Sequence, residues 1–349
     1  MEPSTRQDFI KKSGLALGVG GLASTGLLTT KGLLSQASAA TNSGGKRWAS
    51  GMKVHFFGGG GAADQYARVV VDGAKQAASD IGCSLTVLYS NWVAGTELSQ
   101  CRQSIAERPD AIGLYGGPGD AAIMPLAAQA AKAGVEMSYW NCDVPKVRAA
   151  YGGGYVGVEN WHQVGYDLAV FTIDRYHLKP GNQAIDFGFF NVPGLAPRDN
   201  GIADGLKAKG LKVTKLLLDA TTGTNPESQT GVVVGALAKY PDAKVLSLSG
   251  GQWVGCAGYY LKAAGFKPGQ VNVIGFDPEL GVAQAEVANW AQVVVTQEPF
   301  LQGYMTVMSL CLQKVFKLLP FVIDTAAGNY VTSDNVHSVY PLIKAGLFA

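Results

Sequence analysis

The fold is decided by two stretches, Val271-Asn-Val-Ile-Gly-Phe-Asp277 and Val293-Val-Val-Thr-Gln-Glu-Pro299. Each begins with an apolar run suited to a buried strand, and a helical pattern lies between them. The first run ends in Asp277 and the second leads to Gln297. Because ligands bind beyond the carboxyl ends of parallel strands, both side chains are candidates for holding a polar ligand. The alternative is that Asp277 caps the next helix and Gln297 fills a turn.

The same alternation of apolar runs and helical patterns extends along most of the 349 residues. It predicts strands in the first half at Lys53–Phe57, Ser84–Tyr89, Ala111–Tyr115 and Glu136–Trp140. After the interruption Tyr151-Gly-Gly-Gly154 it predicts strands at Gln183–Phe190, Lys212–Leu218, Lys244–Leu248, Val271–Phe276 and Gln292–Thr296. Such a series predicts an α/β fold of two doubly wound parallel-sheet lobes, and the chain length exceeds what one core usually supports.

The last elements leave the second lobe. A helix predicted at Leu301–Leu318 and a strand at Phe321–Asp324 lack partners there, so we expect the chain to cross back to the first lobe. The expected division is 52–157 with 299–325 for the first lobe, and 158–298 with 326–349 for the second.

The first 39 residues are predicted to be a signal peptide, followed by a flexible lead-in over 40–51. Arg6, Lys11 and Lys12 precede a weakly apolar stretch, and Ala37-Ser38-Ala39 fits signal peptidase, with cleavage before Ala40. The start resembles a twin-arginine signal with Gln7 in place of the second arginine. We therefore expect export to the periplasm; a retained membrane anchor is the alternative.

Charge argues against nucleic-acid binding. The first 39 residues hold four of the 28 basic and two of the 26 acidic residues, so the remainder carries 24 of each. A balanced chain has no electrostatic reason to bind nucleic acid or acidic membranes.

The five cysteines are expected to be buried thiols, with a Cys83–Cys101 bridge as the alternative in an oxidising compartment.

Two short motifs point away from nucleotide chemistry. The run 58–63, Gly-Gly-Gly-Gly-Ala-Ala, matches the dinucleotide pattern, but Tyr89-Ser-Asn91 stands where that fold needs an acidic residue. Leu248-Ser-Gly-Gly-Gln252 matches the signature of ABC-transporter ATPases, yet the chain has no phosphate loop.

The four histidines have no metal-binding spacing, and no nucleophile elbow is present. We expect no cofactor, no metal and no catalysis.

Aromatic residues gather just past the predicted strand ends. They are Tyr66, Trp92, Tyr115, Trp140 and Trp253. Aromatic faces pack on the C–H faces of sugar rings while nearby amides and carboxylates bond the hydroxyls, so this mixture favours a sugar or polyol. Taken singly, each ring is explained as well by a place in the core.

The chain resembles type I periplasmic substrate-binding proteins of the ribose/galactose-binding group, which serve ABC importers. The resemblance rests on the order and spacing of several motifs: Gln65-Tyr66 through Val71-Asp-Gly-Ala-Lys75, Arg108-Pro-Asp-Ala-Ile112, Gly119-Asp-Ala121, Ala130-Ala-Lys-Ala-Gly-Val135, Val273-Ile-Gly-Phe-Asp277 and Thr296-Gln-Glu-Pro299. It implies a monomer of two lobes joined by a three-crossing hinge, with the ligand in the cleft between them.

The resemblance also implies roles for single residues. Asp277 and Gln297 match the family's second-lobe aspartate and hinge glutamine, and Asp64 and Tyr66 fall in the loop after the first strand. Asn141 stands where sugar binders often carry an aspartate.

Two departures from the family pattern set this chain apart. Ile202 occupies the nearest place to a family arginine, with Arg198 and Asn200 only nearby. Gly250-Gly251 replaces an Asn-Asp pair, which leaves Ser249, Gln252 and Trp253 as substitutes.

The expected function is capture of a small neutral ligand and its delivery to an ABC permease. A periplasmic sensor that signals to a chemoreceptor or kinase is the alternative. A LacI-type regulator has the same fold, but the signal-like segment stands where its DNA-binding helices belong.

Overall fold

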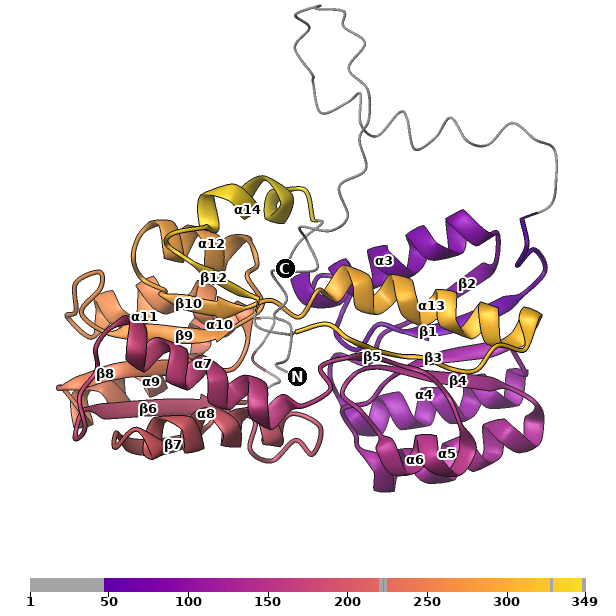
Figure 1. Ribbon diagram of the computed structural model, residues 1–349, viewed down its shortest axis with the longest axis horizontal. Coiled ribbons are helices and arrows are strands. Elements are labelled where there is room, and N and C mark those ends of the chain that lie inside the picture. The colour runs from indigo at the N-terminus through magenta and orange to yellow at the C-terminus, as the bar shows by residue number, and fades with distance from the viewer. Residues whose placement is uncertain (1–46, 220–221, 223–224, 327–328, 347–349) are drawn as a thin grey trace, which may run out of the picture. The chain divides into compact units, whose positions relative to one another are not determined.

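The structure is a computed structural model that describes residues 47–219, 222, 225–326 and 329–346. The predicted signal peptide and most of the predicted lead-in lie outside these residues. The described residues form two six-stranded sheets, each covered by helices, and we call each sheet with its helices a lobe (Figure 1).

The first sheet has the strand order β11-β5-β4-β3-β1-β2. Its strands are β1 (Lys53–Phe57), β2 (Ser84–Leu88), β3 (Ala111–Tyr115), β4 (Glu136–Asn141), β5 (Tyr155–Gly157) and β11 (Val322–Asp324), all paired in parallel. Its helices are α3 (Gln65–Ile81), α4 (Ala94–Glu107), α5 (Asp120–Ala133), α6 (Pro145–Tyr151) and α13 (Pro299–Phe316).

The second sheet repeats this order as β12-β10-β9-β8-β6-β7. Its strands are β6 (Gln183–Gly188), β7 (Lys212–Leu217), β8 (Ala243–Leu248), β9 (Asn272–Phe276), β10 (Val293–Val295) and β12 (Tyr330–Thr332). Its helices are α7 (Trp161–Arg175), α8 (Ala196–Ala208), η3 (Pro226–Gln229), α9 (Thr230–Lys239), α10 (Gly251–Gly255), α11 (Ala257–Ala263), α12 (Leu280–Val287) and α14 (Val336–Lys344). Only β12 runs antiparallel to its neighbour among these described strands.

The strands are apolar along their length because helices cover both faces of each sheet. Phe56 and Phe57, adjacent in β1, pack into two different hydrophobic clusters on opposite faces of the first sheet. In the second lobe Leu246 and Val245 of β8 divide in the same way. This two-sided burial is what makes parallel strands continuous apolar runs in the sequence.

Close helix crossings complete each lobe. In the first, a Cβ on Gly73 of α3 would lie 2.0 Å from the Phe300 carbonyl oxygen, and one on Gly303 of α13 would lie 1.8 Å from that of Val70. In the second, a Cβ on Gly165 of α7 would lie 2.1 Å from the carbonyl oxygen of Arg198 in α8. Only glycine allows these backbones to approach so closely. Figure 1 shows α3 and α13 side by side.

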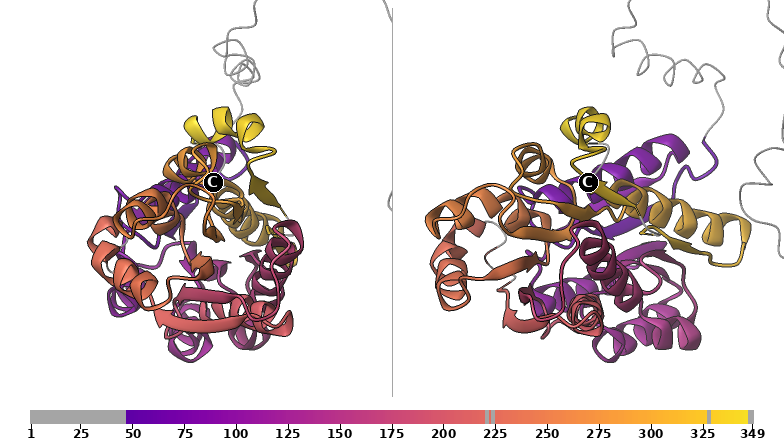
Figure 2. Two further views of the ribbon diagram at one scale, coloured as in Figure 1. Left: turned by 90° about the vertical axis from the view of Figure 1, so that its left-hand side faces the viewer. Right: turned by 60° about the vertical axis from the view of Figure 1, so that its left-hand side comes forward.

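The chain passes between the two sheets three times: from β5 to α7, from β10 to α13, and from β11 to β12. Two turned views show the second-lobe helices α12 and α14 lying together (Figure 2). The predicted fold class, two doubly wound parallel-sheet lobes, is confirmed. The exact division of the chain into the predicted lobe ranges stays a prediction.

Three details differ from the sequence expectations. Tyr151-Gly-Gly-Gly154 does not separate the lobes, because β5 follows it and pairs with β4 in the first sheet. The apolar pattern after the first strand of the second lobe predicts a helix over Gly201–Lys209, but α8 begins at Ala196, with a proline in its first turn. The pattern also predicts one helix over Val254–Ala264, where the structure has α10 and α11, divided at Cys256.

Candidate ligand-binding site

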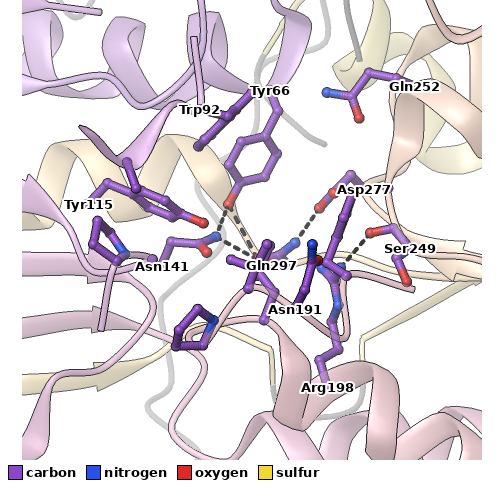
Figure 3. Close-up of a pocket in the computed structure, with 18 of the residues that line it drawn as sticks. Tyr66, Trp92, Tyr115, Asn141, Asn191, Arg198, Ser249, Gln252, Asp277 and Gln297 are labelled. Carbon is purple, nitrogen blue, oxygen red and sulfur yellow. Dashed lines mark hydrogen bonds between the residues drawn. The ribbon is translucent and has the colours of Figure 1, made fainter. Parts of the chain in front are cut away.

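A cavity of about 240 Å³ lies where the carboxyl ends of the two sheets face each other. Its wall draws on both lobes, with Tyr66, Trp92, Tyr115 and Asn141 from the first and Arg198, Ser249, Trp253 and Asp277 from the second (Figure 3). In both sheets the strand order reverses beside the first strand, and this is where ligands bind in doubly wound folds.

Gln297 joins the two lobes at the bottom of the cavity. Its side-chain nitrogen donates to Oδ1 of Asp277 at 2.5 Å, and its Oε1 accepts from Nδ2 of Asn141 at 2.9 Å. The hydroxyl of Tyr66 donates to the same Oε1 at 3.3 Å and accepts from Asn141 at 2.7 Å. Figure 3 shows this chain of bonds from Tyr66 to Asp277. Gln297 therefore holds the sequence-predicted polar residues of both lobes in one network.

Asn141 and Asp277 occupy matching positions in the two lobes. Asn141 ends β4 and Asp277 follows β9, which take the same place in the two sheet orders. Both have a left-handed backbone with φ of 66°. Asparagine and aspartate tolerate this conformation better than other residues with a side chain. Asp277 does not cap α12, whose N-cap is Glu279.

Asp277 is buried, with 6% of its surface exposed. Burial raises the pKa of this carboxyl to about 7, and Arg198 and the bond from Gln297 only partly oppose that rise. Near neutral pH its carboxyl can therefore donate or accept a hydrogen bond, which suits a ligand hydroxyl.

Arg198 lies on the cavity wall in the first turn of α8, although the sequence left the family arginine without a clear counterpart. Its Nε donates to Oδ1 of Asp199 at 2.9 Å and its Nη2 to the carbonyl oxygen of Ser249 at 2.6 Å. The guanidinium also lies 4.5 Å from the ring centroid of Phe276. Ile202 is instead buried in the hydrophobic core.

Asn200 lies outside the cavity, contrary to expectation. Its Oδ1 accepts a hydrogen bond from Nζ of Lys215 at 2.6 Å. The helical spacing explains this, because two residues along a helix point in very different directions from the axis.

Aromatic rings form the apolar part of the wall. Trp92 and Tyr115 meet edge to face with ring centroids 5.2 Å apart, and Trp253 meets Phe189 at 5.4 Å. Trp140 does not line the cavity: it lies fully buried behind Tyr115, and its Nε1 donates to the carbonyl oxygen of Phe57 at 2.9 Å.

Asp64 and Gln252 connect the lobes beside the cavity. Asp64 caps α3 by accepting from the Ala67 amide, and its Oδ2 accepts from Nε1 of Trp92 at 2.9 Å and from Nε2 of Gln252 at 3.3 Å. Gln252 lines the cavity and Asp64 does not. A second link is a backbone bond from the Gly194 amide to the Gly117 carbonyl oxygen at 3.3 Å. These links describe a closed arrangement of the lobes.

The structure adds wall residues that the sequence did not suggest, Glu97, Phe189 and Asn191, and it places Trp92 and Ser249 in the wall as well. The sequence could have identified Glu97. It lies at helical spacing from Cys101, Ser104 and Ile105, and these four residues form the buried face of α4. An acidic residue on such a face needs an explanation.

Among the described residues, no group of three or more His, Cys, Asp or Glu could hold a metal ion. No helix there is long and apolar enough to cross a membrane.

Comparison with known proteins identifies similar structures. One is a solute-binding protein of an ABC transporter from Burkholderia graminis C4D1M in complex with D-arabinose, at 23% identity over 83% of this chain and 98% of that chain, TM-score 0.72. Another is a carbohydrate transporter from Acidothermus cellulolyticus 11B in complex with myo-inositol, at 17% identity over 85% and 99%, TM-score 0.71. A third is a periplasmic solute-binding protein from Actinobacillus succinogenes 130z with bound D-allose, at 19% identity over 82% and 99%, TM-score 0.70. At these sequence identities, the similarity shows that the fold is shared and nothing more.

Sequence comparison gives the family. A search of the curated proteins finds no match. A family model described as "Periplasmic binding protein domain" matches residues 59–315, which is more than half of the chain and includes both lobes. By this match, and by the two-lobed fold that it describes, the chain belongs to the periplasmic binding protein domain family.

Proposed function

We propose that this protein is an exported solute-binding protein that encloses a small sugar or polyol between its lobes and delivers it to an ABC importer. The observation that carries the proposal is the bonded network of Asn141, Gln297 and Asp277 at the cavity floor. It presents amide and carboxyl groups from both lobes to one space. A ligand that bonds both lobes stabilises the closed state over the open one.

The size and lining of the cavity support a monosaccharide-sized ligand. A cavity of about 240 Å³ lies just below the range of about 300–1,000 Å³ that is usual for small-molecule pockets, so it suits a small ligand. The rings of Trp92, Tyr115 and Trp253 can pack on the C–H faces of a sugar. Arg198 is already paired with Asp199, so the wall offers no free positive charge for an acidic ligand. The neighbours with bound D-arabinose, myo-inositol and D-allose agree with this choice.

The remaining parts of the proposal follow from the family and from the leader-like start. We propose that the protein acts in the periplasm as a monomer, without catalysis, and that its partner is the membrane subunits of an ABC permease. Two of the similar structures are named as ABC-transporter solute-binding proteins, which favours transport over the sensor alternative.

A binding screen tests the proposal. The protein from residue 40 onward is heated with D-arabinose, D-allose, myo-inositol and a panel of related sugars and polyols. A ligand present at 100 times its Kd should stabilise the protein by about 2.7 kcal/mol, which appears as a higher Tm. If no sugar or polyol raises the Tm, while a charged metabolite does, the proposed ligand class is wrong.

A further inference from the structure

Glu97 is a buried acid in the cavity wall that the network around Gln297 does not use. It lies in the first turn of α4 and is 1% exposed. An acidic residue in a first turn is favoured by the helix dipole, but that effect operates equally at an exposed position. The dipole therefore does not explain why this carboxyl is placed inside the cavity wall.

The carboxyl of Glu97 has unused bonding capacity. None of the described residues forms a hydrogen bond with its Oε1. Burial raises the pKa of Glu97 well above its usual value, and a hydrogen bond with the Tyr115 backbone offsets only part of that rise. A buried polar atom without a partner costs about 1–3 kcal/mol, so the folded protein bears this cost until a hydrogen-bonding group reaches the carboxyl.

The surroundings of Glu97 favour a neutral partner. No basic side chain of the described residues forms an ion pair with it, and Arg198, the cation of this cavity, is paired with Asp199. A protonated carboxyl both donates and accepts a hydrogen bond, and so does a hydroxyl. The two groups therefore satisfy each other without a net charge in the cavity.

We propose that Glu97 is a ligand-binding residue that exchanges hydrogen bonds with a hydroxyl of the bound sugar or polyol, from the first lobe, as Asp277 does from the second. This inference rests on the proposed function. It identifies the ligand as one with hydroxyls on two sides, because the two acids belong to different lobes. The rings of Trp92 and Tyr115 in the same cavity wall can pack on the ring or carbon chain of the ligand.

Two substitutions separate a protonated from an ionised role. Glu97→Ala removes the group, and Glu97→Gln keeps its shape and one donor without charge. Affinities for D-arabinose, D-allose and myo-inositol are measured by calorimetry on all variants. Glu107→Ala, an exposed change at the other end of α4, is the matched control. For the probe that binds, we expect a loss of about tenfold or more for Glu97→Ala, about threefold or less for Glu97→Gln, and none for the control.

Each outcome decides the matter. Unchanged affinity of Glu97→Ala overturns the assignment of Glu97 to the ligand. An equal loss in Glu97→Gln and Glu97→Ala overturns the exchange of hydrogen bonds and indicates an ionised carboxylate that only accepts from the hydroxyl. If the unaltered protein binds none of the probes, the proposed function fails for these sugars and takes this inference with it. Retained circular dichroism and Tm in Glu97→Gln exclude misfolding as the cause of a loss.

Discussion

At the scale of single residues, Asp277 and Asn141 have the same backbone conformation, and each places a polar side chain in the cavity from its own lobe. The left-handed turn after β4 and β9 ends each strand and places an amide or a carboxyl at the cavity floor. Gln297 then orients both by using its two ends for different partners, so the network depends on an amide at that position.

Loss of the Asp277 side chain should weaken binding strongly. Asp277→Ala removes a hydrogen-bonding group to the ligand and leaves the Gln297 amide without its partner. We expect affinity to fall by about ten- to hundredfold, which corresponds to about 1.5–3 kcal/mol. Calorimetry with the sugar found in the screen measures this. Asn200→Ala, outside the cavity, is the control, and equal affinities of the two variants would remove Asp277 from the site.

The raised pKa of Asp277 also predicts a pH-dependent stability. Its value of about 7 in the folded protein compares with an ordinary value of 3.8, so the folded state holds the proton more tightly than the unfolded chain. The free energy of unfolding therefore falls as pH rises from about 4 to 7, because Asp277 ionises more readily in the unfolded chain. Above pH 7 Asp277 is ionised in both states and the loss is complete. Asp277→Asn cannot ionise and should be more stable than the unaltered protein at pH 8, by about 1–3 kcal/mol, with a smaller difference at pH 5.

Urea unfolding of the ligand-free proteins at both pH values measures this difference. Other buried acids titrate equally in both proteins. A change with pH in the difference between their free energies of unfolding therefore comes from position 277. A gap that stays constant between pH 5 and pH 8 would contradict the burial of an ionisable Asp277.

Sequence and structure agree at some of these residues for a physical reason. Asp277 and Gln297 follow apolar strands directly, so their place at a sheet edge could be predicted. Trp140 could not be placed, because β4 is buried on both faces and its pattern does not say which face meets the ligand. Glu97 and Arg198 lie on helices, and their approach to the cavity depends on how α4 and α8 pack.

At the scale of elements, helix crossings at glycine fix the layers around each sheet. Gly303→Ala should destabilise the protein by about 1–3 kcal/mol, because its Cβ would meet the Val70 carbonyl at 1.8 Å and force α13 from α3. Gly231→Ala in α9 is the matched control, since no atom lies within 4 Å of its Cβ. That change should stabilise by about 0.4–1 kcal/mol.

Chemical denaturation compares these two variants. Equal changes in the free energy of unfolding would mean that the close approach of α3 and α13 adds no cost at Gly303. Opposite signs support the crossing.

Element prediction succeeded where the pattern was long. β1 and β3 begin and end where expected. The missed elements include β5 and β12 with three residues each, α6 with seven and α14 with nine. A run of three residues has too little periodicity to be recognised, and only its neighbours in the sheet make it a strand.

At the scale of the whole described unit, closure depends on contacts between lobes as well as on the ligand. Gln252→Glu places a second carboxyl 3.3 Å from that of Asp64, so like charges disfavour the closed state. Solution scattering of the ligand-free variant should give a larger radius of gyration than that of the unaltered protein. Its affinity for the ligand should fall in proportion to the fraction of molecules that are closed. Gln284→Glu adds the same charge at an exposed position and should change neither.

The two-lobed architecture could be predicted from the alternating pattern, but its closed arrangement could not. Bonds such as Gln252 to Asp64 join residues 188 positions apart. The return to the first lobe was expected from the unpartnered last elements, but the full set of three crossings was expected only from the family resemblance. Nothing local in β12 marks the sheet to which it belongs.

The backbone bond between Gly194 and Gly117 has a consequence for the solvent. A methyl group on Gly194 would come within 2.8 Å of the Cys142 Cβ and 3.0 Å of the Gly117 Cα, so it would wedge the rims apart. Bare main chain at both positions lets the two segments come within a hydrogen bond of each other where they meet at the cavity wall. On the proposed function, a narrower opening lowers the local dielectric and strengthens the polar contacts of the solute, so its affinity depends in part on two positions that offer it no side chain at all.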